Sequence, residues 1–243
     1  MERIIQKLVH MCGYHISRLP QGPKNNAFTA MQRLLAGTEN PIIFDVGAHS
    51  GYVSKTFRDL FPTAEIYAFE PFEESFEILK ENSASDPGIH VFNFGLSDRD
   101  GPQAFHSNLD SGTNSLLSTH ESGAQTWRAG LFDTQKIIQA QFKTIDSVVA
   151  EMDIQKIDIL KLDVQGAEHR VITGAADACK RGMIRLIYSE IITQPTYNDQ
   201  KRFDEALAPF YNNSFDLYNM YNLNTTSEGR LRQIDAIFTK TVG

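Results

Sequence analysis

The sequence predicts a doubly wound α/β fold on a mainly parallel sheet, with an antiparallel strand near the C-terminus. Short apolar, β-branched segments alternate with segments of helical periodicity, which is typical of parallel sheets covered by helices. Glycine and acidic residues follow the first two apolar segments, where open α/β sheets bind ligands. The chain has 243 residues, which is enough for one sizeable domain with a buried core.

The regular alternation begins after Pro41. Residues 42–46 form a short apolar run followed by glycine, which predicts a strand buried on both faces. The strands predicted after it are 65–70, 89–94, 157–163 and 184–190, with weaker strands near 215–218 and 234–240. The helices predicted between them are 52–61, 73–82, 144–152, 167–178 and 199–211.

Residues 1–40 are predicted to form an N-terminal helical extension to the main domain, which spans 41–243. Apolar residues recur at helical spacing over 4–16, and a second helix is expected over 27–35. This extension has a net charge of +3, so the other 203 residues carry −10. It could contact an anionic partner or a membrane surface, although a solvated helical lid is the interpretation that we favour.

Residues 97–142 interrupt the alternation with a polar segment rich in Ser, Asn, Asp, Gly and Gln. We expect a hairpin around Asp100-Gly101. Long insertions in compact domains are commonly lids or binding loops. This insertion is therefore predicted to shape a binding site.

Composition disfavours several classes of protein. A net charge of −7 and a pI of about 5.5 argue against a nucleic-acid binder. Cys12 and Cys179 are too few for a disulfide framework and match no zinc pattern. No apolar run approaches the ~20 residues that span a bilayer. A signal-peptide core is not recognisable at the N-terminus. We therefore expect a cytoplasmic location without a transmembrane segment.

The first candidate site is the turn Asp45-Val46-Gly47-Ala48-His49-Ser50-Gly51, which begins at the end of the first predicted strand. Gly47 and Gly51 let the backbone turn tightly and approach a ligand without a Cβ in the way. Backbone amides at the start of the next helix can bind a carboxylate. The methionine part of S-adenosylmethionine (SAM) carries a carboxylate, although glycines after a strand can also form a plain turn.

Glu70 closes the second predicted strand, 19 residues after Gly51, and Pro71 ends that strand. A carboxylate here can accept hydrogen bonds from both ribose hydroxyls of a nucleoside cofactor, with an ordinary strand-terminal acid as the alternative. NAD sites share this layout but require G-x-G-x-x-G, whose middle glycine admits the pyrophosphate. His49 stands at that position and would crowd a pyrophosphate. The sequence therefore favours SAM over NAD.

The third candidate site is segment 160–169. Asp163 ends a predicted strand, should face the same crevice and could orient the reacting group. Glu168 lies in the first turn of the next helix, where it could take a proton, position an acceptor or only complement the helix dipole. His169 titrates near neutrality, but we favour a surface position for it. Glu190 ends the following strand and could contact a polar acceptor.

Together these motifs resemble the FkbM-type methyltransferases, a family of SAM-dependent enzymes that are mostly O-methyltransferases of sugars and natural products. The resemblance covers about residues 40–190 and implies the Rossmann-like sheet of class I methyltransferases. The matching segments are 44–48 with 51–52, 68–71, 96–98, 144–146, 159–164 and 166–168.

The resemblance also implies roles for particular residues. It implies that Asp45, Gly47, Gly51 and Glu70 bind SAM, that Asp98 reaches the adenine amine, and that Asp163 lies near the transferred methyl group. His49 and Pro71 are included in the predicted cofactor site. Two residues depart from the family pattern, because the family commonly has Asn at His49 and Glu at Gln165. The second departure weakens a role for position 165 as a base or metal ligand.

The predicted function is therefore SAM-dependent O-methylation of a small-molecule or saccharide hydroxyl, with S-adenosylhomocysteine as the other product. The insertion would shape the acceptor pocket, with its polar residues 107–108 and 113–115 available to a sugar. The alternatives are an NAD-dependent oxidoreductase and a catalytically silent SAM-fold binding module. The sequence leaves open whether Asp163, Glu168 and Glu190 gather a divalent metal or act only as carboxylates. It also leaves the oligomeric state open.

Overall fold

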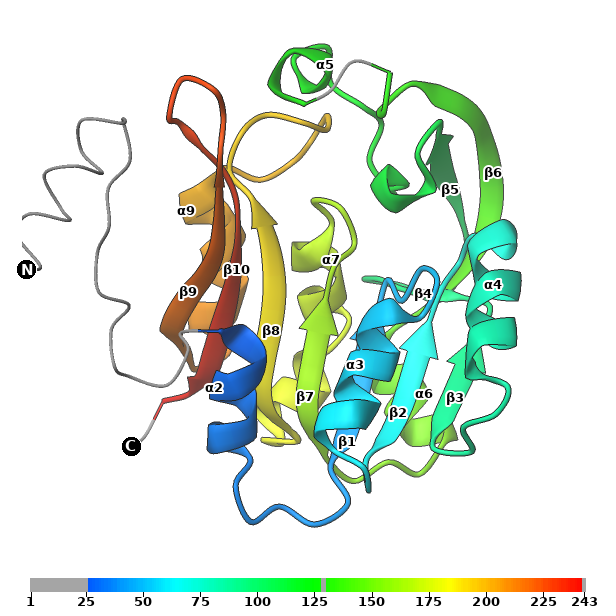
Figure 1. Cartoon of the computed structure of the whole chain (residues 1–243), viewed down its shortest axis with the longest axis vertical. Helices are drawn as coiled ribbons and strands as arrows, with labels where there is room; N and C mark the ends of the chain where they lie inside the picture. The colour runs from blue at the N-terminus through cyan, green and yellow to red at the C-terminus, as the bar shows by residue number, and fades with distance from the viewer. Residues whose placement is uncertain (1–25, 128–129, 242–243) are drawn as a thin grey trace, which may run out of the picture.

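A seven-stranded sheet forms the centre of the computed structural model, which describes residues 26–127 and 130–241 (Figure 1). Its strands are β1 (Ile42–Val46), β2 (Glu65–Phe69), β3 (Ile89–Phe92), β7 (Ile157–Leu162), β8 (Ile184–Ile192), β9 (Phe215–Thr225) and β10 (Leu231–Lys240). Their order is β3-β2-β1-β7-β8-β10-β9. Every pair from β3 to β8 is parallel, whereas β10 is antiparallel to both β8 and β9. The predicted fold class is confirmed.

The strand order places a ligand site between β1 and β7. The chain runs from β1 outward to β2 and β3, and then returns to β7 on the other side of β1. At such a reversal the loops after the two strands diverge and leave a crevice at their carboxyl ends. All six residues of β7 are buried, as expected for a central parallel strand covered on both faces.

Helices cover both faces of the sheet (Figure 1). One face packs against α2 (Ala27–Leu34), α3 (Tyr52–Leu60) and α4 (Glu73–Ser83). The opposite face packs against α6 (Ile145–Glu151), α7 (Glu168–Thr173), α8 (Ala176–Lys180) and α9 (Phe203–Asn212). Polar caps define several helix starts. The side chain of Asn26 accepts a hydrogen bond from the Phe28 amide, and that of Thr144 accepts one from the Ser147 amide.

Two of the predicted helices differ from the structure. The helix expected over 167–178 is split at Gly174 into α7 and α8, and Gly174 lies so close to the Ser97 backbone that a Cβ there would be 2.0 Å from the Ser97 oxygen. The helix expected from Asp199 begins only at Phe203. Asp199 has a φ of +59°, and the Gln200 side chain accepts hydrogen bonds from the amides of residues 196 and 197.

The insertion (97–142) and the residues that flank it form a second, small sheet. Its strands are β4 (Gly95–Leu96), β5 (Gly101–Asn108) and β6 (Thr134–Lys143), in the order β4-β6-β5. The turn at Asp100-Gly101 therefore joins two strands that flank β6, and the hairpin predicted there is wrong. The long partner of β5 is β6, which is antiparallel to it. Between these strands lie the 3-10 turn η1 (Ser111–Thr113) and the short helix α5 (Gly123–Thr126).

The second helix of the predicted N-terminal extension is confirmed as α2. Ala27, Ala30 and Met31 are buried in the core that α2 shares with the sheet, and the Phe28 ring packs edge-on against Phe57. The first expected helix, over 4–16, lies outside the described residues, so the division at residue 40 stays a prediction. In the described part of the chain, no helix has the length and apolarity needed to cross a membrane.

Candidate active site

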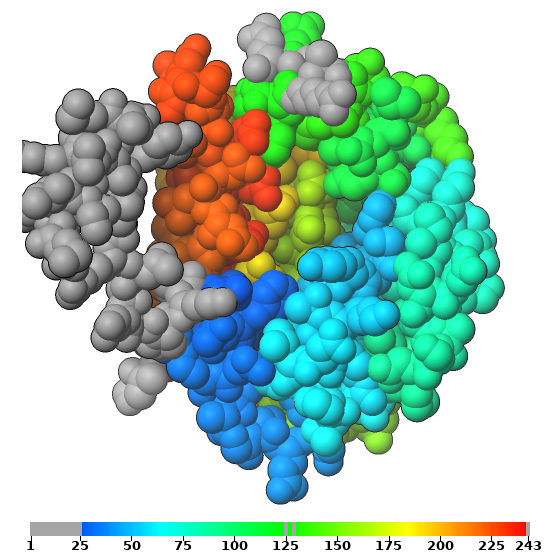
Figure 2. Space-filling model, viewed as in Figure 1, coloured from blue at the N-terminus to red at the C-terminus, as the bar shows by residue number. Residues whose placement is uncertain are grey.

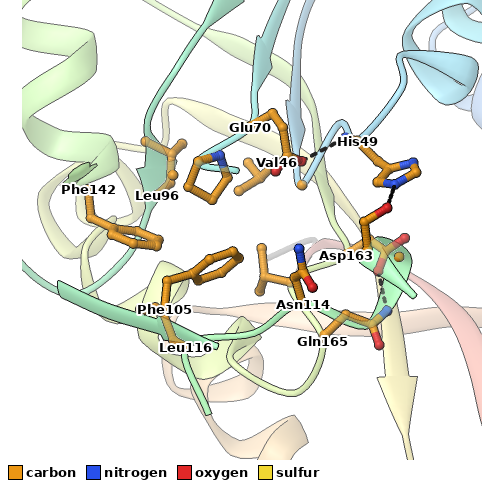
Figure 3. Close-up of a pocket in the computed structure, with 16 residues that line it drawn as sticks. Val46, His49, Glu70, Leu96, Phe105, Asn114, Leu116, Phe142, Asp163 and Gln165 are labelled. Atoms are coloured by element: carbon orange, nitrogen blue, oxygen red, sulfur yellow. Dashed lines mark hydrogen bonds between the residues drawn. The ribbon is translucent and has the colours of Figure 1, made fainter. Parts of the chain in front are cut away.

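A cavity of about 200 Å³ lies at the carboxyl ends of β1, β2 and β7, where the insertion forms its opposite wall (Figure 3). One end is apolar, and the other is polar. The apolar end is lined by Pro71, Leu96, Phe105, Leu116 and Phe142. The polar end is lined by Gly47, His49, Ser111, Asn114, Asp163 and Gln165. An aromatic base and a charged amino-acid group would therefore fit opposite ends.

The molecule is also hollowed on the face that carries α2 and α3. Figure 2 shows a recess bounded by the β9–β10 pair, α3 and the insertion, with the yellow-green and yellow segments around β7 and β8 at its floor. Asp163 follows β7, and Glu190 lies near the end of β8. The recess therefore gives a second molecule a route toward the polar residues at these strand ends.

Gly47 allows the first turn to pass close to the end of β7. Its φ is +76°, and a Cβ on Gly47 would lie 1.9 Å from the backbone oxygen of Asp163. The Asp163 amide also donates to the Val46 oxygen at 3.1 Å, which fixes this close approach. Gly51 also has a positive φ but is the N-cap of α3 and does not line the cavity.

Glu70 lines the cavity and is held by two backbone amides. Its Oε2 accepts a hydrogen bond from the His49 amide and its Oε1 one from the Phe72 amide, both at 2.9 Å. Burial raises the pKa of this carboxyl to about 7, against the opposing effects of the two amides and the nearby Lys161 ammonium. The carboxylate is thus oriented where ribose hydroxyls could donate to it, and Pro71 lines the adjoining wall.

His49 connects the glycine turn to the insertion. Its backbone is left-handed, with a φ of +50°, and its Nε2 lies 2.8 Å from the Ser111 hydroxyl of η1 (Figure 3). The imidazole therefore stands at the polar end of the cavity, beside the place predicted for the cofactor. The sequence could place His49 in the turn, but it could not identify Ser111 as its partner.

Asp45 lies beneath the turn, away from the cavity. It is fully buried, accepts a hydrogen bond from the Ser54 hydroxyl at 2.6 Å, and pairs with the Lys161 ammonium at 2.8 Å. Lys161 Nζ also donates to the Gly47 oxygen at 2.9 Å. Asp45 therefore acts on the turn through Lys161. Lys161 is thus a further site residue, which local motifs do not single out, although a charge within the buried apolar strand β7 is a signal in the sequence.

Asp98 does not line the cavity. Its Oδ1 accepts a hydrogen bond from the Ser97 hydroxyl at 3.0 Å, and its charge lies near His169 on α7. The apolar end of the cavity is instead reached by Leu96, two residues earlier. A contact between Asp98 and an adenine amine thus stays a prediction that this geometry does not favour.

The three predicted catalytic carboxylates differ in their hydrogen bonds. Glu168 Oε1 accepts from the amides of Val164 and Gly166, at 3.1 and 3.2 Å, and burial raises its pKa to about 7. Both oxygens of Glu190 accept from side-chain amides, those of Gln165 and Gln233. Burial, with the neighbouring negative charges, raises the Glu190 pKa well above its usual range.

Asp163 is the one of the three that lines the cavity. Its side chain is 35% exposed, and its Oδ1 accepts a hydrogen bond from Gln165 at 2.9 Å. Its Oδ2 lies 3.9 Å from the Lys161 ammonium and accepts no hydrogen bond from the described residues. Asp163 therefore keeps one oxygen free for a ligand.

Gln165 holds two of these carboxylates together. Its Nε2 donates to Asp163 Oδ1 and to Glu190 Oε2, each at 2.9 Å, and its Oε1 lies 3.0 Å from the Tyr197 hydroxyl. A glutamate here could not donate to both carboxylates while it is ionised. The bonds to both carboxylates therefore explain why this chain has an amide at position 165.

A metal site does not emerge from this arrangement. Within 26–127 and 130–241, no group of three or more His, Cys, Asp or Glu side chains is placed to hold a metal ion. Glu168 and Glu190, two of the three carboxylates considered as metal ligands, instead accept the hydrogen bonds described above.

Comparison with known proteins gives a consistent family match. A family profile described as the methyltransferase FkbM domain matches residues 45–217. The 2-O-methyltransferase NoeI of Sinorhizobium fredii is 31% identical over 170 residues, which cover 66% of this chain and 67% of NoeI. The 31-O-demethyl-FK506 methyltransferase FkbM of Streptomyces tacrolimicus is 27% identical over 157 residues, covering 56% of this chain and 60% of that protein.

A third relative is the hexuronic acid methyltransferase AglP of Haloferax volcanii. It is 28% identical over 144 residues, which cover 58% of this chain and 52% of AglP. The chain thus spans between about half and two thirds of the length of these three relatives.

Proposed function

The chain belongs to the FkbM family of SAM-dependent methyltransferases, and we propose that it methylates a hydroxyl oxygen of a saccharide or another natural product. The observation that carries this proposal is the free oxygen of Asp163. It lies on the cavity wall, which neither Glu168 nor Glu190 lines, and both oxygens of Glu190 accept hydrogen bonds from side-chain amides.

The cavity residues fit SAM. The apolar end suits an adenine ring, the Glu70 carboxylate suits ribose hydroxyls, and the glycine turn leaves room for the amino-acid part. Because any Cβ at Gly47 would clash with β7, the glycine lets the turn and the end of β7 form one continuous binding surface. When bound, SAM supplies an electrophilic methyl carbon.

Asp163 is the residue that we assign as general base. Its Oδ2 would take the proton that the acceptor hydroxyl gives up on methylation, and bound SAM would supply the methyl group. Gln165 holds the other carboxylate oxygen in place, and Lys161 balances the negative charge from 3.9 Å away. The chain's remaining contribution is to align the acceptor and exclude water.

The acceptor class is supported by the relatives. By their names, one methylates a 2-O position, one an FK506 derivative and one a hexuronic acid. The polar recess at the ends of β7 and β8 suits a hydroxyl-rich acceptor of this kind. The NAD alternative finds no support in the family match. A silent binding module would leave the free oxygen of Asp163 without a role.

Calorimetric titration with SAM, S-adenosylhomocysteine and NAD tests the cofactor. We expect heat with the first two and none with NAD; the reverse result would remove the proposal. A SAM-consumption screen against sugars and small natural products then identifies an acceptor. On that acceptor, Asp163→Asn should lower kcat by about 100-fold or more, with SAM affinity kept within about twofold.

Glu70→Ala provides the contrasting variant. We expect it to weaken SAM binding by about tenfold or more, because the ribose loses its carboxylate partner. If neither substitution changes activity on the acceptor, the site assignment is wrong. The cytoplasmic location and the absence of a nucleic-acid partner stay predictions.

A further inference from the structure

Asn114 presents an unpaired amide nitrogen to the cavity. It comes from the insertion, directly after η1, and only 8% of it is exposed. Its Nδ2 is buried and has no hydrogen-bond partner among residues 26–127 and 130–241. Figure 3 shows this nitrogen directed toward the space enclosed by Glu70, Phe105 and Asp163. A buried donor without a partner costs free energy, so such a group is expected to bond the ligand that the cavity takes up.

The orientation of this amide is fixed by its neighbours. The backbone amide of Asn108 donates to Asn114 Oδ1 at 2.7 Å. A flipped side chain would set the Nδ2 donor against the Asn108 N–H donor, so the oxygen faces Asn108 and Nδ2 is the side-chain atom on the other side, as drawn in Figure 3. Asn108 is itself held, because its Nδ2 donates to the Thr113 oxygen and its Oδ1 accepts from Thr134.

We propose that Asn114 is a cofactor-binding residue contributed by the insertion, whose Nδ2 donates a hydrogen bond to an oxygen of bound SAM. The inference rests on the proposed function, since it takes SAM as the ligand of this cavity. The position of the donor supports the assignment. Asn114 follows Ser111, whose hydroxyl bonds His49 of the glycine turn, so the insertion meets the cofactor side of the site here. The insertion is thereby part of the cofactor site as well as a wall for the acceptor.

Calorimetry with S-adenosylhomocysteine tests this contact without a known acceptor. Asn114→Ala removes the donor, and Asn114→Asp replaces it by an oxygen while leaving an acceptor for Asn108. We expect both variants to bind S-adenosylhomocysteine about tenfold more weakly than the wild type, the loss of one buried hydrogen bond. 5′-Methylthioadenosine, which lacks the amino-acid part, locates the contact. An equal loss with this probe assigns the contact to the nucleoside, and no loss assigns it to the carboxylate.

Thr134→Val is the matched control, because it breaks the same network at Asn108 without touching the cavity. We expect it to bind S-adenosylhomocysteine like the wild type. Two results would overturn the inference: binding by both Asn114 variants within twofold of the wild type, or an equal loss in all three variants with matching losses in thermal stability. If the wild type itself binds neither SAM nor S-adenosylhomocysteine, the proposed function fails first. If Asn114→Ala does not fold, Asn114→Asp decides the question.

Discussion

Backbone groups hold the cofactor half of the site, which consists of Gly47, His49 and Glu70. Glu70 is fixed by two amides, and Gly47 lies against the Asp163 carbonyl. In the acceptor half, which consists of Asp163, Gln165 and Glu190, side chains hold one another instead, since one amide bonds both carboxylates. A disturbed backbone cannot relax locally, whereas a side-chain network loses one bond at a time. We therefore expect large losses when the backbone of the first half is disturbed, and smaller losses when one hydrogen bond that holds Asp163 is removed.

The largest effect is expected for Gly47→Ala. The new Cβ would lie 1.9 Å from the Asp163 oxygen at a φ of +76°, so the turn must separate from β7. SAM affinity should fall by at least about 100-fold, and the free energy of unfolding by about 3 kcal/mol. Calorimetry and denaturant unfolding measure the two quantities.

Gly37→Ala is the control for backbone strain. Gly37 has a similar φ of +80° but nothing within 4 Å of a Cβ. It should cost only the 1–2 kcal/mol of a left-handed residue and leave SAM binding intact. Equal behaviour of the two variants would show that strain alone, and not the close approach, matters.

A smaller effect is expected for Gln165→Met, which has a similar shape but no donors. Both carboxylates lose a hydrogen bond at 2.9 Å, so kcat should fall about tenfold while SAM affinity stays within about twofold. Gln165→Glu should instead make kcat depend on pH, because only a protonated glutamate can donate to a neighbouring carboxylate. Steady-state kinetics across pH 5 to 9 would contradict this if both variants matched the wild type.

The pH dependence of cofactor binding should reveal the ionisation of the Glu70 carboxyl. Its pKa is raised to about 7 by burial, so the protonated form favours the folded protein. Its contribution to folding is complete below its ordinary pKa of about 4.5 and lost as pH rises through 7, roughly 3 kcal/mol in all. SAM binding should change oppositely and strengthen from pH 6 to 8, because the ionised carboxylate accepts the ribose hydroxyls.

Glu70→Gln isolates this titration from that of Glu168, whose pKa is raised to a similar value. The other charged or titratable groups around Glu70, which are Asp45, His49 and Lys161, stay in place in this variant. Thermal shifts with and without SAM at each pH give both trends. A variant with the same pH dependence as the wild type would assign the effect to another group.

The smallest effect is expected for Arg232→Gln. The Arg232 guanidinium lies over the Trp127 ring at 4.2 Å and donates to the Thr126 oxygen and to Asn224 Oδ1. It thereby joins the insertion to the β9–β10 pair. Its loss should lower the free energy of unfolding by about 1 kcal/mol, raise the acceptor KM a few-fold and leave SAM affinity unchanged. Exposed Arg230→Gln is the control, and an equal KM change there would remove the role of Arg232.

The two halves also differ in how much of them the sequence predicts. Gly47 and Glu70 follow their strands directly, so local pattern is enough to place them in one crevice. The network around Asp163 joins β8, β10 and the segment after β8 to the turn at Gln165. Such partners become neighbours only when the sheet has formed. Gln165 was therefore known as a departure from a family pattern, and its bonds to Asp163 and Glu190 were not.

The doubly wound, mainly parallel sheet was predictable, but the path of the insertion was not. Alternating apolar and helical segments require a parallel sheet, whereas the turn at Asp100-Gly101 has the composition of a hairpin without being one. The path of the insertion depends on the pairing of β6 with β4 and β5, which are far from it in the sequence. Local turn residues do not reveal such long-range pairing. For the same reason Asn114 could be suggested as a polar contact but not oriented.

The pairing of β4 with β6 has a consequence for how this enzyme can evolve. Gly95 lies opposite Phe142 and Leu96 opposite Lys143, so the two ends of the insertion meet side by side. Chain added between them closes a loop whose ends are already fixed, and doubling the length of a flexible loop costs only about 0.6 kcal/mol. Selection can therefore lengthen, shorten or replace the tip of the insertion with little penalty to folding, while the glycine turn remains unchanged.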